Sequence, residues 1–177
     1  MKRKLLYAVA AQHRGLLFPE HVCQRIAQLV DVVPAAVPDK PDREFLMRHL
    51  PEAEILITSW GTASLAADLL PAAEKLRLVG HAAGSVKPIM TEAAWQRGIR
   101  VTSGAPAIAF SVAEFCLGMM LMAARRVFWL EKRARQGHWR ETWSFFGPAF
   151  EIYRQNVGVI GASNVGRRLI QLLQPFG

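Results

Sequence analysis

The sequence feature that most constrains the fold is a glycine-containing turn near the end of the chain, within residues 157–166. Residues 157–160 are an apolar run of the kind that forms a buried strand. After the turn, Val165, Leu169 and Leu172 recur at the spacing of one helix face. A strand, a glycine turn and a helix in this order are typical of the first crossover of a dinucleotide-binding fold, where the helix start binds a pyrophosphate.

The turn is an imperfect G-x-G-x-x-G motif, because Ser163 stands between Gly161 and Gly166 where the motif has its middle glycine. That glycine lets the backbone approach the phosphates, whereas a serine adds a hydroxymethyl group and a donor. Three interpretations remain: a nucleotide-binding turn, a purely structural strand–helix turn, and the nucleophile elbow of a hydrolase that uses Ser163. The elbow is disfavoured because its motif requires a glycine where Val165 stands.

The chain up to residue 102 alternates between short apolar runs and helical patterns. We expect strands at 5–10, 30–33, 55–57, 76–79 and 99–102, and helices at 20–29, 41–50, 64–70 and 91–97. Helices between successive strands imply right-handed crossovers and parallel strands. The expected fold class is therefore α/β, with a doubly wound parallel sheet.

Composition and cysteine usage favour a globular protein of the cytoplasm. The chain has 177 residues, of which 51% are hydrophobic and 20% charged, enough for one full domain and part of a second. Cys23 and Cys116 are far apart and show neither zinc-ligand spacing nor a disulfide framework, so we expect no metal and a reducing, cytoplasmic location. Residues 1–11 imitate a signal peptide, but the apolar run fits a first strand better.

The net charge of +8 permits association with nucleic acid or an anionic membrane. Much of the excess lies in one stretch that contains Arg125, Arg126, Lys132, Arg133, Arg135 and Arg140. A solvated basic helix end accounts for this stretch, because basic side chains complement the dipole of a helix in its last turn. We therefore predict no nucleic-acid partner and no membrane partner.

A long helix is predicted at 111–136. Ser111 and Glu114 have the spacing of a capping box, which would start the helix. The residues that follow are apolar on nearly every face, so we expect the helix to be buried between two domains or two subunits. Glu114 interrupts the apolar run, which argues against a membrane span.

Three turns follow strands at the edge where ligands bind in parallel sheets, at 59–62, 81–87 and 103–106. Small residues in the second turn expose backbone N–H groups that could bind an anion; these residues are Ala83, Gly84 and Ser85. His81 and Lys87 flank the turn. A lone histidine at a strand end is more often an ordinary hydrogen-bonded residue than a catalyst, and Lys87 is interpreted as solvated.

Several linked segments resemble the N-terminal portion of the D-isomer-specific 2-hydroxyacid dehydrogenases. They are LRLVGHAAGSV at 76–86, RGIRVTS at 97–103 and SVAE at 111–114, followed at family-like intervals by the long helix and by 157–166. The resemblance covers nearly everything from residue 52 onward. It implies a flavodoxin-like substrate domain at 1–110, a connecting helix and loop at 111–150, and the start of an NAD-binding Rossmann domain at 151–177.

The resemblance also implies the binding residues. Backbone groups of Ala83, Gly84 and Ser85 would hold the substrate carboxylate. The cofactor turn would comprise Gly161, Ser163, Asn164, Val165 and Gly166, with the N–H groups of Asn164 and Val165 facing the pyrophosphate of NAD; NADP is not excluded. The chain departs from the family at Lys87, Ala109 and Ser163, where aspartate, often threonine, and glycine are usual, which suggests a divergent branch.

The catalytic arginine, glutamate and histidine of the family follow the Rossmann strands. None of the five histidines of this chain occupies the catalytic position; they are His13, His21, His49, His81 and His138. We therefore expect the catalytic set to lie beyond Gly177 and the 177-residue chain to be inactive alone. A truncated gene, an expressed part of a gene and a proteolytic product all remain possible sources.

The function implied is NAD-dependent oxidation of the CH–OH group of a D-2-hydroxy acid, or reduction of the 2-keto acid, by a homodimer joined through the helix at 111–136. The alternative is a non-catalytic nucleotide-sensing or partner-binding module of the same fold, with the basic stretch as its partner surface. The residues that would contact the variable part of the substrate are not assigned, so the particular hydroxy acid stays open.

Overall fold

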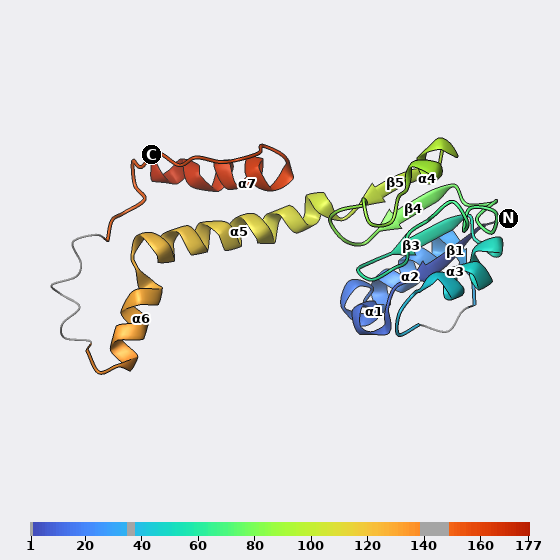
Figure 1. The fold of residues 1–177 in the computed structure, drawn as a ribbon, viewed down its shortest axis with the longest axis horizontal. Coiled ribbons are helices and arrows are strands. Elements are labelled where there is room, and N and C mark those ends of the chain that lie inside the picture. The colour runs from blue at the N-terminus through green and yellow to red at the C-terminus, as the bar shows by residue number, and fades with distance from the viewer. Residues whose placement is uncertain (1, 35–37, 139–148) are drawn as a thin grey trace. The chain divides into compact units, whose positions relative to one another are not determined.

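A computed structural model describes residues 2–34, 38–138 and 149–177. The chain divides into two compact units, Met1–Ala105 and Pro106–Gly177. The first unit contains the sheet, and the second contains three helices in its described part (Figure 1).

The first unit is built on a five-stranded parallel sheet with the order β2-β1-β3-β4-β5. The strands are β1 (Arg3–Ala8), β2 (Val30–Val32), β3 (Ile55–Thr58), β4 (Leu78–His81) and β5 (Arg100–Ser103). This order is that of flavodoxin-like doubly wound sheets, so the predicted fold class is confirmed. The start of the chain forms β1, as predicted, and β4 lies two residues later than its predicted range.

Helices connect the strands except β3 and β4, which are joined by turns. The helices are α1 (Ala11–Leu17), α2 (Glu20–Leu29), α3 (Arg43–His49), the short 3-10 helix η1 (Leu50–Glu52) and α4 (Glu92–Gln96). Side-chain caps fix two of the starts, since Asp42 accepts from the N–H of Phe45 and Thr91 accepts from that of Ala94. Helix α1 was not predicted.

The helix predicted at 64–70 is wrong. Leu65 instead forms an isolated parallel bridge with Met90, and its N–H donates to the carbonyl oxygen of Ile89 at 2.8 Å. This pairing holds the backbone at Leu65 extended. The apolar residues that follow lie in turns, and their side chains pack into the core.

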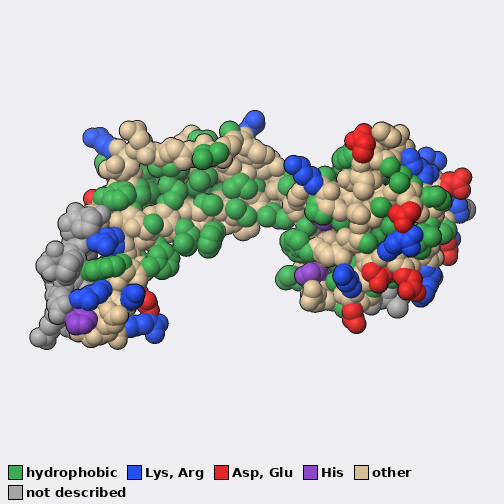
Figure 2. Space-filling view, in the orientation of Figure 1, with side chains coloured by type: hydrophobic (Ala, Val, Ile, Leu, Met, Phe, Trp, Pro, Cys, Tyr) green, Lys and Arg blue, Asp and Glu red, His purple; other side chains and the backbone are tan. Residues whose placement is uncertain are grey.

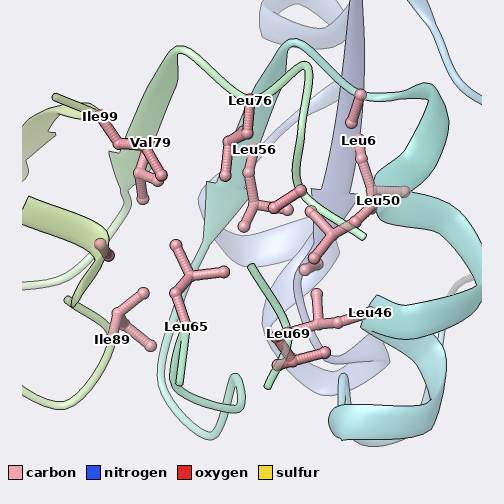
Figure 3. Close-up of a cluster of buried hydrophobic side chains, with 14 of the residues drawn as sticks. Leu6, Leu46, Leu50, Leu56, Leu65, Leu69, Leu76, Val79, Ile89 and Ile99 are labelled. Carbon is pink, nitrogen blue, oxygen red and sulfur yellow. The ribbon is translucent and has the colours of Figure 1, made fainter. Parts of the chain in front are cut away.

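The core lies on one face of the sheet. Leu6, Leu56 and Val79 are in register on β1, β3 and β4, and all three are fully buried. Figure 3 shows the side chains that pack over them from the helices and turns of this face; these are Leu46, Leu50, Leu65, Leu69, Leu76, Ile89 and Ile99. These buried strand residues belong to the short apolar runs from which the strands were predicted.

The opposite face of the sheet is more open. Its central row consists of Tyr7, Ile57, Gly80 and Thr102, which are in register across four strands. Phe18 covers Tyr7, with ring centroids 5.3 Å apart. A shallow hollow of about 210 Å³ lies over the rest of the row and is lined by Phe18, Ile57, Gly80, His81, Ala82 and Thr102.

The second unit contains α5 (Ala105–Ala124) and α6 (Val127–Arg135) in place of the single helix predicted at 111–136. Figure 1 shows α6 turning away from the axis of α5. Arg126 adopts a left-handed backbone with φ 55°, which ends α5. The predicted capping box is also wrong, because Ser111 lies inside α5 and its hydroxyl donates to the carbonyl oxygen of Ile108 at 3.1 Å.

Helix α5 buries only small residues, Ala109, Ala113 and Ala124, and exposes large apolar side chains such as Phe115, which is 67% exposed. Figure 2 shows the hydrophobic side chains gathered over this unit. By length and composition α5 could cross a membrane, as the core helices of soluble proteins also could. Glu114 interrupts the apolar run without preventing α5 from having this length and composition, and the absence of a membrane partner stays a prediction.

The last part of the second unit forms α7 (Asn164–Leu173) and the 3-10 helix η3 (Gln174–Phe176). Helix α7 lies along α5 (Figure 1), and the Arg168 guanidinium lies 4.7 Å from the centre of the Phe110 ring. The helix was predicted correctly. The strand predicted at 157–160 is wrong, because this segment has no strand beside it among the described residues and Ile160 is fully exposed.

Candidate functional site

The turn after β4 presents unpaired backbone donors. Ala82 closes the turn, since its N–H donates to the carbonyl oxygen of Thr58 at 2.8 Å. Within the described residues, the N–H groups of Ala83, Gly84 and Ser85 donate to no protein acceptor. Consecutive free N–H groups in a turn form a concavity that suits an anion such as a carboxylate. The structure therefore leaves the three predicted N–H groups without a protein acceptor in the described part of the chain; Ser85 is exposed and Gly84 half-buried, whereas Ala83 is buried.

Gly104, in the predicted turn at 103–106, fixes the turn after β4 from the neighbouring strand. Its N–H donates to the carbonyl oxygens of His81 and Ala83, at 2.9 Å and 3.0 Å. A Cβ on Gly104 would lie 3.4 Å from the Ala83 carbonyl oxygen, closer than most side chains approach. The small residue thus allows the end of β5 to hold the turn, while the turn keeps its N–H groups free.

His81 is buried at the base of the turn. Its Nδ1 and the hydroxyl of Thr58 are 2.9 Å apart, across the carboxyl ends of β4 and β3. Burial lowers the pKa of His81 from its ordinary value, which favours the neutral ring. This agrees with the interpretation of His81 as a hydrogen-bonded residue. Lys87 is exposed, as predicted.

The glycine turn before α7 has the backbone that its motif requires. Gly161 has φ +87°, a conformation that L-residues rarely adopt. A Cβ on Gly166 would collide with the carbonyl oxygen of Gly161. These are the tight-turn and close-packing roles of the first and third glycines of a dinucleotide-binding motif.

The first turn of α7 is open for a ligand. Arg167 is the first residue of α7 whose N–H is paired, to Ser163 at 2.9 Å, and the N–H groups of Asn164, Val165 and Gly166 have no acceptor among the described residues. Ser163 is exposed and does not cap the helix with its side chain. Its φ of −81° and ψ of −160° describe extended backbone, which argues against the strained nucleophile elbow.

The described residues contain no group of three histidine, cysteine or acidic side chains that could hold a metal ion. Of the basic stretch, Arg140 lies outside the described residues. Arg125 pairs with Glu151 at 2.6 Å, Arg135 pairs with Glu131, and Arg126 lies over the ring of Trp129. The basic charge of this stretch is therefore partly neutralised locally.

Comparison with known proteins identifies the family. Residues 117–177 match the family model described as D-isomer specific 2-hydroxyacid dehydrogenase, NAD binding domain. D-3-phosphoglycerate dehydrogenase of Methanocaldococcus jannaschii is 33% identical over 135 residues, which is 76% of this chain and 25% of that enzyme. The chain belongs to the D-isomer-specific 2-hydroxyacid dehydrogenase family. The matched family model is an NAD-binding domain, which confirms NAD as the predicted cofactor.

Solved structures have the same fold as this dehydrogenase-family chain. A protein from Pyrococcus horikoshii superposes with a TM-score of 0.80 at 24% identity, over 100% of this chain and 51% of its own. D-lactate dehydrogenase from Aquifex aeolicus, solved with NAD and lactic acid, gives 0.69 at 22% identity, over 98% of this chain and 49% of its own. The chain thus spans about a quarter of the curated relative and about half of each of these structures.

Proposed function

We propose that this chain supplies the substrate-binding domain and the first cofactor-binding turn of an NAD-dependent oxidoreductase. The reaction is oxidation of the CH–OH group of a D-2-hydroxy acid, or reduction of the matching 2-keto acid. Family membership supports this proposal, since the curated relative is named a dehydrogenase. The proposed division is a substrate domain at 1–110, a connector at 111–150 and the start of the nucleotide domain at 151–177.

The observation that carries the proposal is a set of unpaired backbone N–H groups in each unit. One set belongs to Ala83, Gly84 and Ser85, and the other opens α7. The substrate carboxylate and the cofactor pyrophosphate are both anions, and free N–H groups in turns and at helix starts bind anions. Every α-helix starts with unpaired N–H groups, so α7 supports the proposal through the glycine turn that precedes it.

The glycine turn before α7 fits NAD for two reasons. Gly161 has a positive φ, and Gly166 packs so closely against the Gly161 carbonyl oxygen that a Cβ would collide with it. In this proposal the N–H groups of Asn164 and Val165 bind the pyrophosphate, and Ser163 starts the helix. NAD, when bound, exchanges a hydride with C2 of the substrate. The residue that discriminates NAD from NADP in Rossmann folds follows the second strand of that domain, so NADP stays open.

Proton transfer to the substrate oxygen needs an acid–base residue held by a partner. Among the described residues His81 has no carboxylate partner, and its Nδ1 pairs with the hydroxyl of Thr58. We therefore propose that the family's arginine, glutamate and histidine come from outside residues 1–177, and that this chain alone gives no turnover. Oxidation of NADH by the purified chain with any member of a 2-keto acid panel would contradict this part.

Amide chemical shifts of the chain test the binding roles directly. Pyruvate should shift the resonances of Ala83, Gly84 and Ser85, and acetone, which has the ketone without the carboxylate, is the matched control. NADH should shift Asn164 and Val165, with adenosine as the control that lacks phosphate. Shifts no larger with pyruvate or NADH than with their controls would refute the proposed sites.

Homodimer formation through the α5 region is part of the same proposal. Large apolar side chains on α5 remain exposed, Phe115 and Phe110 among them, and such surfaces commonly mark interfaces. Phe115→Ser should convert a dimer to a monomer in sedimentation analysis, whereas Leu16→Ser, at a residue 78% exposed on α1, should not. A wild-type chain that sediments as a monomer at high concentration would refute the proposed homodimer.

The alternative, a non-catalytic partner-binding module, depends on the basic stretch around α6. Local pairing of Arg125 and Arg135 with glutamates leaves less charge for a partner, so we favour the enzyme. Neither nucleic acid nor membrane is proposed as a partner, and the proposed location is the cytoplasm. The test is retention of the chain on an anionic resin. Retention that weakens with salt and is lost in Lys132→Gln would instead favour the module.

A further inference from the structure

Arg167 occupies an electrostatically unfavourable position. It lies in the first turn of α7, where the helix dipole and the unpaired N–H groups already place positive charge. No acidic residue lies in that turn to offset it. A cation placed there becomes favourable when an anion binds at the same helix start.

One contact directs the side chain of Arg167 toward the glycine turn. Its Nε donates to the carbonyl oxygen of Ala162 at 2.8 Å, so the guanidinium is held beside the turn between Gly161 and Ser163. The two terminal nitrogens have no acceptor among the described residues, and the residue is exposed. A guanidinium anchored through Nε still has its terminal N–H groups free for an oxyanion.

The neighbouring Arg168 shows that this placement is specific to Arg167. The Arg168 guanidinium lies over the Phe110 ring and donates to the side chain of Gln171 at 3.2 Å, one turn further along the helix. The two arginines carry the same charge on the same helix, but only Arg167 contacts the glycine turn. Arg168 is therefore a matched control.

We propose that Arg167 is a phosphate-binding residue of the cofactor site, whose guanidinium contacts the pyrophosphate beside the N–H groups of Asn164 and Val165. This inference rests on the proposed function and adds to it a residue outside the glycine motif. The arginine supplies full charge and N–H donors at a turn where Ser163 replaces the glycine that usually allows the closest approach to the phosphates. Lysine has one nitrogen in place of three, so it cannot keep the Ala162 contact and also present a planar pair of N–H groups to the pyrophosphate; the proposed contact therefore favours arginine.

Binding of inorganic pyrophosphate and of ADP-ribose to the purified chain tests the assignment, with calorimetry and the amide shifts of Asn164 and Val165 as readouts. Ionic strength is matched with sodium chloride. Arg167→Gln should weaken both ligands about tenfold or more, since a charge-assisted contact is lost. Arg167→Lys should restore less than the wild-type affinity, and Arg168→Gln should leave the affinities within about twofold of wild type.

Two outcomes overturn the assignment while leaving the proposed function in place. One is wild-type affinity in Arg167→Gln, and the other is full affinity in Arg167→Lys. A different result would be a wild-type chain that binds neither of these ligands nor NADH. That result would refute the proposed cofactor site itself. Thermal unfolding of each variant without ligand separates loss of contact from loss of folding.

Discussion

The guanidinium carbon of Arg14 lies 3.3 Å from the centre of the Tyr7 ring. This cation–π contact joins α1 to the open face of the sheet, where Phe18 also packs on Tyr7. The buried hydroxyl of Tyr7 makes no hydrogen bond of normal geometry within the described residues, although the Arg14 guanidinium and the Cys23 thiol lie close enough to act on its pKa. Burial also raises the pKa of Tyr7, so the hydroxyl stays protonated.

Tyr7→Phe should stabilise the protein by about 1 kcal/mol, because it removes a buried unpaired hydroxyl and keeps the ring under Arg14. Urea unfolding of both proteins measures the difference. Tyr153→Phe, at a residue 55% exposed, is the control and should change the free energy of unfolding by less than about 0.5 kcal/mol. A loss of stability in Tyr7→Phe would show that the hydroxyl does have a partner in solution.

The lowered pKa of His81 predicts a pH dependence of stability. The folded state favours the neutral ring, so the unfolded state takes up the proton first as pH falls below about 6.5. The stabilisation from neutral His81 is therefore complete above that pH and is lost as pH falls through the lower pKa of the folded state. His81→Asn should flatten this part of the curve, as followed by urea unfolding at successive pH values; an unchanged slope would contradict the assignment.

Gly166→Ala should destabilise α7 by about 1–3 kcal/mol, since the added Cβ meets the carbonyl oxygen of Gly161. NADH binding should be lost with it, because the N–H groups at the helix start move away from their alignment. Gly158→Ala is the matched control, as nothing lies within 4 Å of its Cβ position. Equal effects of the two substitutions, in calorimetry and NADH titration, would show that the turn does not depend on this contact.

Leu56→Ala should cost about 2–5 kcal/mol, because Leu56 is fully buried between Leu6 and Val79 in the centre of the core. Leu16→Ala, on the exposed side of α1, should change little. Far-ultraviolet circular dichroism during urea unfolding measures both. A small effect at Leu56 would mean that the helices and turns over this face re-pack to fill the cavity.

The sequence predicts the sheet well because β1, β3 and β4 each contain a short apolar run, and such runs are visible in a single sequence. It fails at residues 64–70, where the bridge between Leu65 and Met90 depends on a residue far along the chain. The start of α5 was missed although Pro106 stands in its first turn, one of the few helix positions that tolerate proline. The strand predicted at 157–160 had the right composition, but a strand also needs a neighbour.

The candidate site divides in the same way. Gly161 and Gly166 were recognised from motif spacing, and their backbone roles follow from local geometry. Gly104 and Thr58 were not, because each acts on the turn at 82–85 from another strand and only the folded sheet brings them there. Arg167 was not predicted, since its contact with the Ala162 carbonyl oxygen depends on how the turn folds back.

The apolar run from Val157 to Ile160, which forms no strand, has a further consequence for handling the protein. Its backbone groups pair with nothing in the described part of the chain, and Val157 and Ile160 are exposed. An apolar segment of this kind is a template for another strand, which would gain hydrogen bonds by adding beside it. In concentrated solution the same segment from a second molecule can serve, so this run is where we expect cross-β self-association of the chain to begin.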